Sequence, residues 1–245
     1  MSGLSDQAAR LRALHLAPEV LVLPNAWDPV SARRLAADGA LAVATSSAAV
    51  ARAMGSEDEQ RMAAEDMLAA VARIAVAVPE DVPVTADMEA GYGLAPQDLV
   101  RGLAGAGAVG CNLEDTDHRS GGLRPVAEQA ALLRAVKAAG DVVVNARVDV
   151  HLDGGSLEEG LERARAYREA GADCVYPIFA PFPDAVRAYV EAVGPVNVIV
   201  DPADPGAPSL RALAEAGVAR VTFGGGLAAV AYDAASAAWL AFRDA

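Results

Sequence analysis

The chain has 245 residues, of which 53% are hydrophobic, so it is long enough to bury a full core as one large α/β domain. Acidic residues outnumber basic ones by 33 to 20, and the formal charge of −13, with no offsetting basic cluster, argues against a nucleic-acid partner. A small anionic substrate remains compatible with this charge if a metal ion or a local arginine reverses the field inside a pocket.

No targeting or membrane signal is found in the sequence. The first 20 residues contain Asp6 and two arginines and lack a continuous apolar stretch before a cleavage site, so a signal peptide is not expected. No run of 18 uninterrupted apolar residues occurs, so no membrane span is expected. The two cysteines, Cys111 and Cys174, lack CxxC spacing and are expected to be buried and reduced. Together these features predict a cytoplasmic protein.

Short apolar runs of strand length recur along the chain, with helix-length segments between them. The expected strands cover residues 20–27, 40–47, 82–89, 110–115, 142–149, 173–178, 196–201 and 220–225. Helices between them are expected to end at glycines in the left-handed conformation: Gly39, Gly107, Gly140, Gly171 and Gly217. This alternation predicts a single (β/α)₈ barrel of the TIM type over residues 1–245. An open dinucleotide-binding sheet is disfavoured, because "LPNAWDPVS" lacks GxGxxG.

Three segments stand apart from the simple repeat. Residues 48–81 are long for one βα unit, so an extra loop or short helix is expected over one end of the barrel. The turn "FGGGLA" after the last strand is either a phosphate-binding turn or a tight strand-to-helix connection. The final helix, "AAVAYDAASAAWLAFRDA", either closes the barrel or packs on a neighbouring subunit.

Acidic residues gather where the third and fourth strands end, and catalytic groups of such barrels come from these carboxyl ends. Asp87 and Glu89 are two residues apart and therefore share one face of a strand, and Glu114 ends the adjacent strand. Three hard oxygen donors suit Mg²⁺ or Mn²⁺, and Arg147 on the next strand is placed to hold a carboxylate or phosphonate. The alternative is a structural cluster in which the acids cap helices or pair with Arg147.

Several motifs resemble those of the isocitrate lyase and phosphoenolpyruvate mutase superfamily. They are "TADMEAGYG", "GCNLEDT", "NARVDV" and "RARAYREAGAD", in the order and on the strands expected for that family. The resemblance extends over nearly the whole chain. It implies a Mg²⁺-dependent barrel enzyme acting on 2-oxo acids or their enolates. It also implies a homo-oligomer, a tetramer or dimer, that exchanges a terminal helix between subunits.

The resemblance also implies roles for individual residues. Asp87 corresponds to the acid that holds Mg²⁺ directly, with Glu89 and Glu114 acting directly or through water. Glu89 departs from the family's usual Asp, and its extra methylene favours a longer or water-mediated contact. Substrate binding is assigned to Ser46, Ser47, the backbone N–H of Ala48, Asp87 and Arg147. Asn25 and Trp27 are added as substrate-binding candidates because they end the first predicted strand. Trp27 is equally suited to an aromatic plug in the barrel top.

Departures from the family narrow the chemistry. The loop after the fourth strand reads "EDTDHRSGGLRP" and lacks the catalytic cysteine of isocitrate and methylisocitrate lyases. Cys111 precedes Glu114 on the strand itself and is expected to pack in the core. The histidine that phosphonate-cleaving members carry on the sixth strand is replaced by Ile178.

The chemistry common to the family passes through a metal-stabilised enolate and needs no protein nucleophile. An acid must still protonate the enolate, and the candidates are Tyr92, His118 and Asp58, which lies in the loop that closes toward substrate. We expect a carbon–carbon lyase or decarboxylase acting on a small 2-oxo or 2-hydroxy carboxylic acid. The alternatives are a phosphonopyruvate-type P–C hydrolase or mutase, and a catalytically weak oxo-acid-binding protein.

Overall fold

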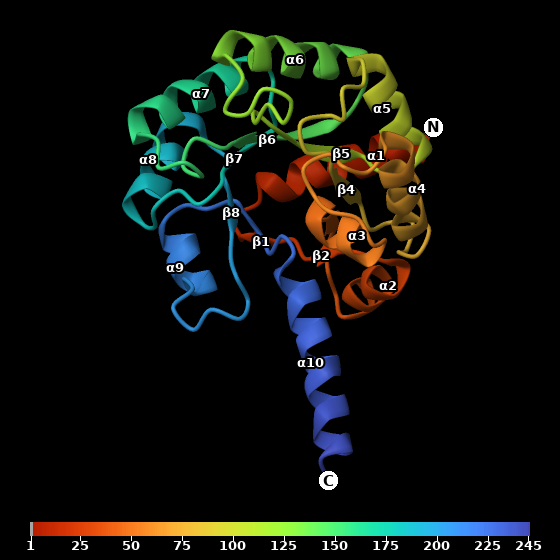
Figure 1. Ribbon diagram of the computed structural model, residues 1–245. Helices are drawn as coiled ribbons and strands as arrows, with labels where there is room; N and C mark the ends of the chain where they lie inside the picture. Colours follow the sequence, from red (N-terminus) through yellow and green to blue (C-terminus); the bar gives the residue numbers. More distant parts are fainter. Residues whose placement is uncertain (1) are drawn as a thin grey trace.

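The computed structural model describes residues 2–245, along which short strands alternate with helices (Figure 1). The strands are β1 (Leu21–Val22), β2 (Asn25–Ala26), β3 (Val43–Thr45), β4 (Val84–Asp87), β5 (Gly110–Glu114), β6 (Val143–Val148), β7 (Cys174–Pro177), β8 (Asn197–Ile199) and β9 (Arg220–Thr222). The helices are α1 (Ser2–His15), α2 (Pro29–Ala37), α3 (Ser47–Ala53), α4 (Ala64–Ala75), α5 (Pro96–Gly105), α6 (Val126–Ala139), α7 (Leu157–Glu169), α8 (Asp184–Val193), α9 (Leu210–Glu215) and α10 (Gly226–Arg243). Each predicted strand range contains an observed strand, and the first contains two.

The strands close into a barrel of the (β/α)₈ type, which confirms the predicted fold class. All of them pair in parallel, in the order β2-β3-β4-β5-β6-β7 in one sheet and β1-β9-β8 in the other. The sheets meet where β1 leads into β2 and where a parallel bridge joins Val175 to Val196. Closure brings the carboxyl ends of all the strands to one opening, the barrel mouth. Its strand ends are Ala26, Thr45, Asp87, Glu114, Val148, Pro177, Ile199 and Thr222.

Proline explains why the first strand is split. The Leu23 N–H still donates to the Val221 carbonyl at 2.8 Å, on the β9 side. Pro24 has no N–H to donate, and its carbonyl accepts from the Ala44 N–H at 2.9 Å, on the β3 side. The chain therefore changes its pairing partner at this point and links the two edges of the barrel.

Four of the five predicted helix-ending glycines adopt the left-handed conformation, with φ between 78° and 100°: Gly39, Gly107, Gly171 and Gly217. The same prediction is wrong for Gly140, whose φ of 172° is ordinary extended backbone. A Cβ at this position would lie 2.8 Å from Cγ1 of Val100 on α5. Close packing of α6 on α5 therefore explains this glycine, and backbone handedness does not.

Residues 48–81 contain the extra elements that their length predicts. Helix α3 starts immediately after β3, and residues 54–63 form a loop before α4. Both Glu59 and Gln60 in this loop have positive φ, at 64° and 58°. Non-glycine residues rarely adopt this conformation, so the loop is held by contacts elsewhere, and these contacts lie at the barrel mouth.

Helix α1 closes the end of the barrel opposite the mouth (Figure 1). Its buried residues Ala8 and Leu11 join a small apolar cluster near the strand starts, with Leu21, Leu23, Ala42, Ala44, Val109 and Val143. At the end of α1, Nδ1 of His15 lies 2.7 Å from the Leu11 carbonyl, and Nε2 lies 3.5 Å from Nη1 of Arg220. A guanidinium only donates, so Nε2 accepts and the imidazole is neutral. Burial and the charge of Arg220 lower the pKa of His15 to about 4.

Helix α10 extends away from the barrel (Figure 1) and does not close it within this chain. Residues 229–245 are exposed, and they include large apolar side chains: Val230, Tyr232, Trp239, Leu240 and Phe242. Of the two interpretations of this helix, contact with a neighbouring subunit fits the exposed apolar surface, and helix exchange itself stays a prediction. No helix within residues 2–245 is both long and apolar enough to cross a membrane.

The buried His15 predicts a loss of stability in mild acid. The unfolded chain takes up a proton on this residue near pH 6.5, whereas the folded protein resists protonation down to about pH 4. The free energy of unfolding therefore falls as the pH drops between these values, by at most about 3 kcal/mol from this group. We expect the decline to be shallower in His15→Gln, measured by urea unfolding at several pH values in this window. Parallel declines for the two proteins would contradict this.

Candidate active site

The acids predicted from the sequence meet on the β3–β6 side of the barrel mouth. Asp87 ends β4, Glu114 ends β5, and Glu89 follows Asp87 by two residues. Glu89 and Glu114 are 4% and 2% exposed, so neither carboxylate can rely on bulk water to stabilise its charge. The surrounding groups must therefore compensate these charges.

Asp87 is held at the start of α3. Its Oδ2 accepts from the backbone N–H of Ser47 at 3.1 Å and from the Ser47 hydroxyl at 2.9 Å. The amide of Asn112 donates to Oδ1 at 3.4 Å, and Thr45 Oγ1 accepts from the Asp87 N–H at 2.9 Å. A carboxylate at a helix N-terminus is favoured by the unpaired N–H groups of the first turn. The direction of the Asp87 side chain is thus set by β3, α3 and β5 together.

Glu89 lies in a strained turn. Its own φ is 45° and that of Tyr92 is 54°, with glycines at positions 91 and 93 also in the left-handed region. The Tyr92 hydroxyl donates to Oε1 of Glu89, and the Gln60 N–H donates to Oε2 at 2.6 Å. Burial raises the pKa of Glu89 to about 7; the Tyr92 hydrogen bond opposes this rise, and the charges of Asp58, Glu114 and Asp87 add to it. The loop that follows β4 and the loop of residues 54–63 are therefore joined through the Glu89 carboxylate.

Glu114 lies between a histidine and an arginine. Its Oε1 is 2.5 Å from Nε2 of His118, and its Oε2 is 2.6 Å from Nη1 of Arg147. The hydrogen bond to Glu114 raises the pKa of His118. His118 Nε2 also lies 3.9 Å from Glu89 Oε2. One ligand atom from each of Glu89, Glu114 and His118 falls within 4.8 Å of the others, a spacing that suits one cation.

The loop after β5 folds tightly over these acids. A short antiparallel bridge pairs Thr116 with Leu123, and the loop turns between them. Arg119 lies over Gly93, where a Cβ would come within 2.7 Å of Nη2. Gly93 is therefore the residue that lets the loops after β4 and β5 approach each other. His118 is carried to the acids by this loop.

Arg147 is fixed by two carboxylates. Its Nε donates to Asp149 at 2.6 Å, and Nη1 forms an ion pair with Oε2 of Glu114. Burial disfavours the charged guanidinium, but Glu114 and Asp149 outweigh this effect and raise the pKa of Arg147. Asp149 is held by Thr116 and by Asp115 in turn. Nη2 of Arg147 donates to no residue within 2–245, which leaves one edge of the guanidinium for another anion.

Asp58 comes from the loop of residues 54–63 and lies beside Ser47 and Asp87. Its Oδ1 is buried and has no hydrogen-bond partner among residues 2–245. Burial and the charge of Asp87 raise the pKa of Asp58. A buried acceptor without a donor is costly unless a proton, a water molecule or a cation satisfies it. This unpaired oxygen, together with the carboxylates of Asp87, Glu89 and Glu114, makes an oxygen donor set that fits a hard divalent cation.

The predicted carboxylate-binding loop starts α3. The Ser46 hydroxyl caps the helix by accepting from the Ala49 N–H at 3.4 Å, and Ser47 is occupied by Asp87. The Ala48 N–H lies in the first turn, where it has no partner within the helix. It remains available to an anionic ligand, and the roles of these three residues stay predictions.

The strand-1 candidates have structural contacts of their own. Asn25 donates to the Thr45 carbonyl and accepts from the Phe223 N–H, both at 2.8 Å, so its amide links three strand ends. Trp27 packs beside Tyr232 of α10, with ring centroids 6.3 Å apart. A substrate contact by either residue stays a prediction.

Three groups at the site were not predicted from the sequence: Asn112, Thr116 and the backbone N–H of Gln60. Asn112 is two residues before Glu114 on β5, so the period-two pattern of a strand places it on the same inward face. The two-residue spacing from Glu114 could therefore have identified Asn112 from the sequence. Gln60 contributes only a backbone group, for which no residue type gives a signal.

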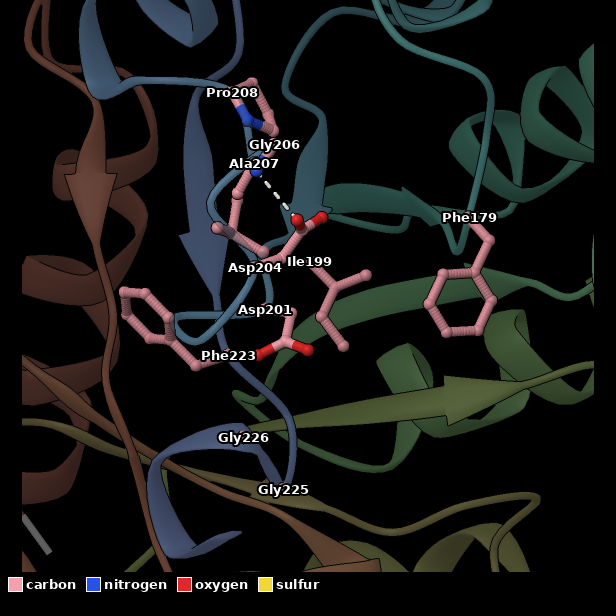
Figure 2. Close-up of a pocket in the computed structure, with 11 residues that line it drawn as sticks. Phe179, Ile199, Asp201, Asp204, Gly206, Ala207, Pro208, Phe223, Gly225 and Gly226 are labelled. Atoms are coloured by element: carbon pink, nitrogen blue, oxygen red, sulfur yellow. Dashed lines mark hydrogen bonds between the residues drawn. The ribbon is translucent and has the colours of Figure 1, made fainter. Parts of the chain in front are cut away.

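A second hollow lies on the opposite side of the mouth, at the ends of β7, β8 and β9 (Figure 2). It has a volume of about 410 Å³ and is lined by apolar groups such as Phe179, Ile199 and Phe223. Asp201 and Asp204 on its wall accept from nearby backbone N–H groups in their own turn. Asp58, Asp87, Glu89 and Glu114 do not line this hollow. Gly225 and Gly226 lead here into α10, so the two interpretations of "FGGGLA" remain open.

Comparison with known proteins places the chain in a family. It matches the phosphoenolpyruvate phosphomutase family over residues 11–242. A phosphoenolpyruvate phosphomutase from Streptomyces hygroscopicus is 33% identical over 231 residues, covering 86% of this chain and 72% of its own length. A 2,3-dimethylmalate lyase from Eubacterium barkeri is 32% identical over 186 residues, covering 70% of this chain and 63% of its own length.

The solved structure of an oxaloacetate acetylhydrolase in complex with its product oxalate has a TM-score of 0.86 at 27% identity, covering 98% of this chain and 88% of that one. The relatives thus include a mutase, a lyase and an acetylhydrolase, so membership alone does not select a reaction. The match over nearly the whole chain, on a barrel with acids at its mouth, shows that this protein belongs to the phosphoenolpyruvate phosphomutase family of the isocitrate lyase superfamily.

Proposed function

We propose that this protein is a Mg²⁺-dependent enzyme that breaks a carbon–carbon bond in a small 2-oxo or 2-hydroxy carboxylic acid. The observation that carries the proposal is the acid cluster, defined as Asp58, Asp87, Glu89 and Glu114. The pKa values of Asp58 and Glu89 are both raised, in part by the other acids. Such mutual repulsion is relieved by a cation, and the two glutamates with His118 have the spacing to hold one.

Residues of this chain provide two anchoring points for a dianionic substrate. The free N–H of Ala48 at the start of α3 suits a carboxylate next to the reacting carbon. The unoccupied Nη2 of Arg147 suits an anionic group at the far end, because Glu114 and Asp149 fix the guanidinium in place. A bound Mg²⁺ would neutralise the acids and stabilise negative charge on the substrate oxygens.

In a 2-oxo substrate, cleavage of the C3–C4 bond releases C4 as carbon dioxide or as part of a carbonyl compound. The bonding electron pair stays on C3 and is delocalised into the 2-oxo group as an enolate. A proton must then reach the carbon that lost its partner. Three side chains near the site are candidates to supply it: the phenol of Tyr92, Asp58, whose pKa is raised, and the imidazole of His118 when it does not hold the cation. The Tyr92 hydroxyl donates its only proton to Glu89, so Tyr92 could protonate a substrate only after that contact breaks.

A second candidate is a mutase or hydrolase acting on a phosphorus–carbon bond. The named mutase relative supports it. Against it, Ile178 is 7% exposed and apolar at the position where the family resemblance implies a phosphonate-binding histidine. A lyase or decarboxylase therefore agrees better with the groups present. An oxo-acid-binding protein without turnover is the remaining alternative.

The central prediction concerns metal-dependent ligand binding. Oxalate resembles the enolate of a 2-oxo acid, and at about 100 times its Kd it is expected to raise the melting temperature of the Mg²⁺ form by roughly 5–10 °C. Asp87→Asn is expected to abolish the rise, and Asp153→Asn, in an exposed loop, to keep it. Thermal unfolding with and without Mg²⁺ measures the effect, and product assays with oxaloacetate, 2-methylisocitrate and sulfopyruvate identify the reaction. No shift at saturating Mg²⁺ would rule out the enzyme proposal.

The raised pKa of Glu89 predicts how metal affinity depends on pH. In the metal-free folded protein Glu89 keeps its proton up to about pH 7, well above the value of 4.5 for an unperturbed glutamate. The contribution of this proton to the free energy of unfolding is fully present below about pH 4.5, and it is lost as the pH rises through about 7. A cation must displace the proton, so Mg²⁺ affinity is expected to fall at most about tenfold per pH unit below 7.

Glu89→Gln removes this proton and is expected to bind Mg²⁺ weakly at every pH, without the steep dependence. Isothermal titration calorimetry at pH 6, 7 and 8 makes the comparison. A wild-type affinity that does not change over this range would show that Glu89 is not among the ligands.

Helix α10 supports the proposal of a homo-oligomer. Trp239 is 59% exposed and Phe242 is 86% exposed, values that a solvated helix of a single chain does not favour. We expect the full chain to form a dimer or tetramer in solution, and Trp239→Glu with Phe242→Glu to shift it toward monomer. Light scattering after size exclusion measures the mass. A monomeric wild-type protein at tens of micromolar would exclude this assembly.

A further inference from the structure

Arg220 is a buried cation in the barrel interior without an ion-pair partner. It is 1% exposed, on β9, and forms no salt bridge with any acid in residues 2–245. Its Nη2 donates to Oδ1 of Asn112 at 3.3 Å, Nη1 faces Nε2 of His15 at 3.5 Å, and Nε has no partner. Burying an unpaired guanidinium is expensive. Because this burial costs stability, we look for a role of Arg220 other than packing.

The contacts of Asn112 give that role a direction. Its Oδ1 accepts from two donors, Nδ2 of Asn145 at 2.9 Å and Nη2 of Arg220. A guanidinium has no acceptor, so the amide cannot be reversed without placing its NH₂ against donors. Nδ2 of Asn112 is therefore turned toward Oδ1 of Asp87, at 3.4 Å. Arg220 thus determines which end of the Asn112 amide the acid meets.

The same chain of contacts runs from one end of the barrel to the other. It begins at His15 on α1, passes through Arg220 on β9 and Asn112 on β5, and ends at Asp87 at the mouth. We call this chain of contacts the relay, and Asp87 is the acid at its end. A fixed positive charge beneath the acid cluster also offsets part of its repulsion, because interactions between charges are screened only weakly in the barrel interior.

We propose that Arg220 is a positioning residue that orients the Asp87 carboxylate for its cation through the amide of Asn112. This inference rests on the proposed metal-binding function. The competing explanation is that Arg220 only fills the barrel interior and supports α1. That explanation predicts a loss of stability on substitution but no change in metal affinity.

The test uses Mn²⁺ alone as the probe, with its Kd measured by electron paramagnetic resonance on the full chain and stability measured separately by urea unfolding. We expect Arg220→Met and Asn112→Leu each to weaken Mn²⁺ binding by about tenfold, as is usual for groups that orient a ligand. The double variant is expected to bind no more weakly than either single variant, because both changes break one relay. Arg220→Lys, which keeps the charge and a donor, is expected to stay within about threefold of the wild type.

Arg168→Met serves as the matched control. Arg168 is partly buried, less deeply than Arg220, and it donates to the carbonyls of Val193 and Ala172, away from the acids. This variant is expected to lose stability and to keep the wild-type Kd for Mn²⁺. If Arg220→Met does not fold, Asn112→Leu and its comparison with the control carry the test.

The outcomes distinguish a failure of the positioning role from a failure of the proposed function. If the wild type binds Mn²⁺ and the Kd of Arg220→Met or Asn112→Leu stays within twofold of the wild-type Kd, the positioning role is overturned. The proposed function would still stand. Additive losses in the double variant would overturn the relay. No Mn²⁺ binding by the wild type would overturn the proposed function and this inference together.

Discussion

Mutual repulsion among buried carboxylates is the constraint on which this structure depends. Four acids lie at one side of the barrel mouth, and two of them are almost fully buried. Each is restrained by a different element: α3 and Asn112 hold Asp87, Tyr92 and Gln60 hold Glu89, and Arg147 with His118 holds Glu114. Such an arrangement is unfavourable by itself, and a divalent cation would turn it into a stable site.

The barrel makes this concentration of charge possible. Closed parallel strands fix the backbone at every carboxyl end, so the loops bring only one or two groups each to the centre. A second ionic network below Arg147, in which Asp115 pairs with Arg163 and Tyr167, keeps Asp149 in place. The opposite half of the mouth carries few charges and is lined by Phe179, Ile199 and Phe223 (Figure 2). The candidate catalytic groups are therefore confined to one side of the barrel mouth, although the same barrel supports both sides.

The strands and the acids were predictable because their signals are local. Apolar runs and helical spacing predicted the barrel, and the strand-end positions of Asp87 and Glu114 placed both acids at its mouth. Glu89 lies in a turn beyond β4, so the shared strand face predicted for it is not the reason it joins them. The unpredicted features depend on contacts between distant segments. Gly140 is required by Val100 across a helix pair, and the Gln60 contact uses only its backbone. Arg220 is 108 residues from Asn112, so no local pattern connects them.

A crystal structure grown with Mn²⁺ and oxalate, with data collected for anomalous scattering, would show whether the acid cluster binds a cation. We expect one strong anomalous peak within coordination distance of the acid cluster, with oxalate oxygens completing the shell between Ala48 and Arg147. A cluster without a peak, or a peak bound elsewhere on the barrel, would contradict it. In that case the acids would be held by their protein partners alone, and the raised pKa values of Asp58 and Glu89 would have a purely structural origin.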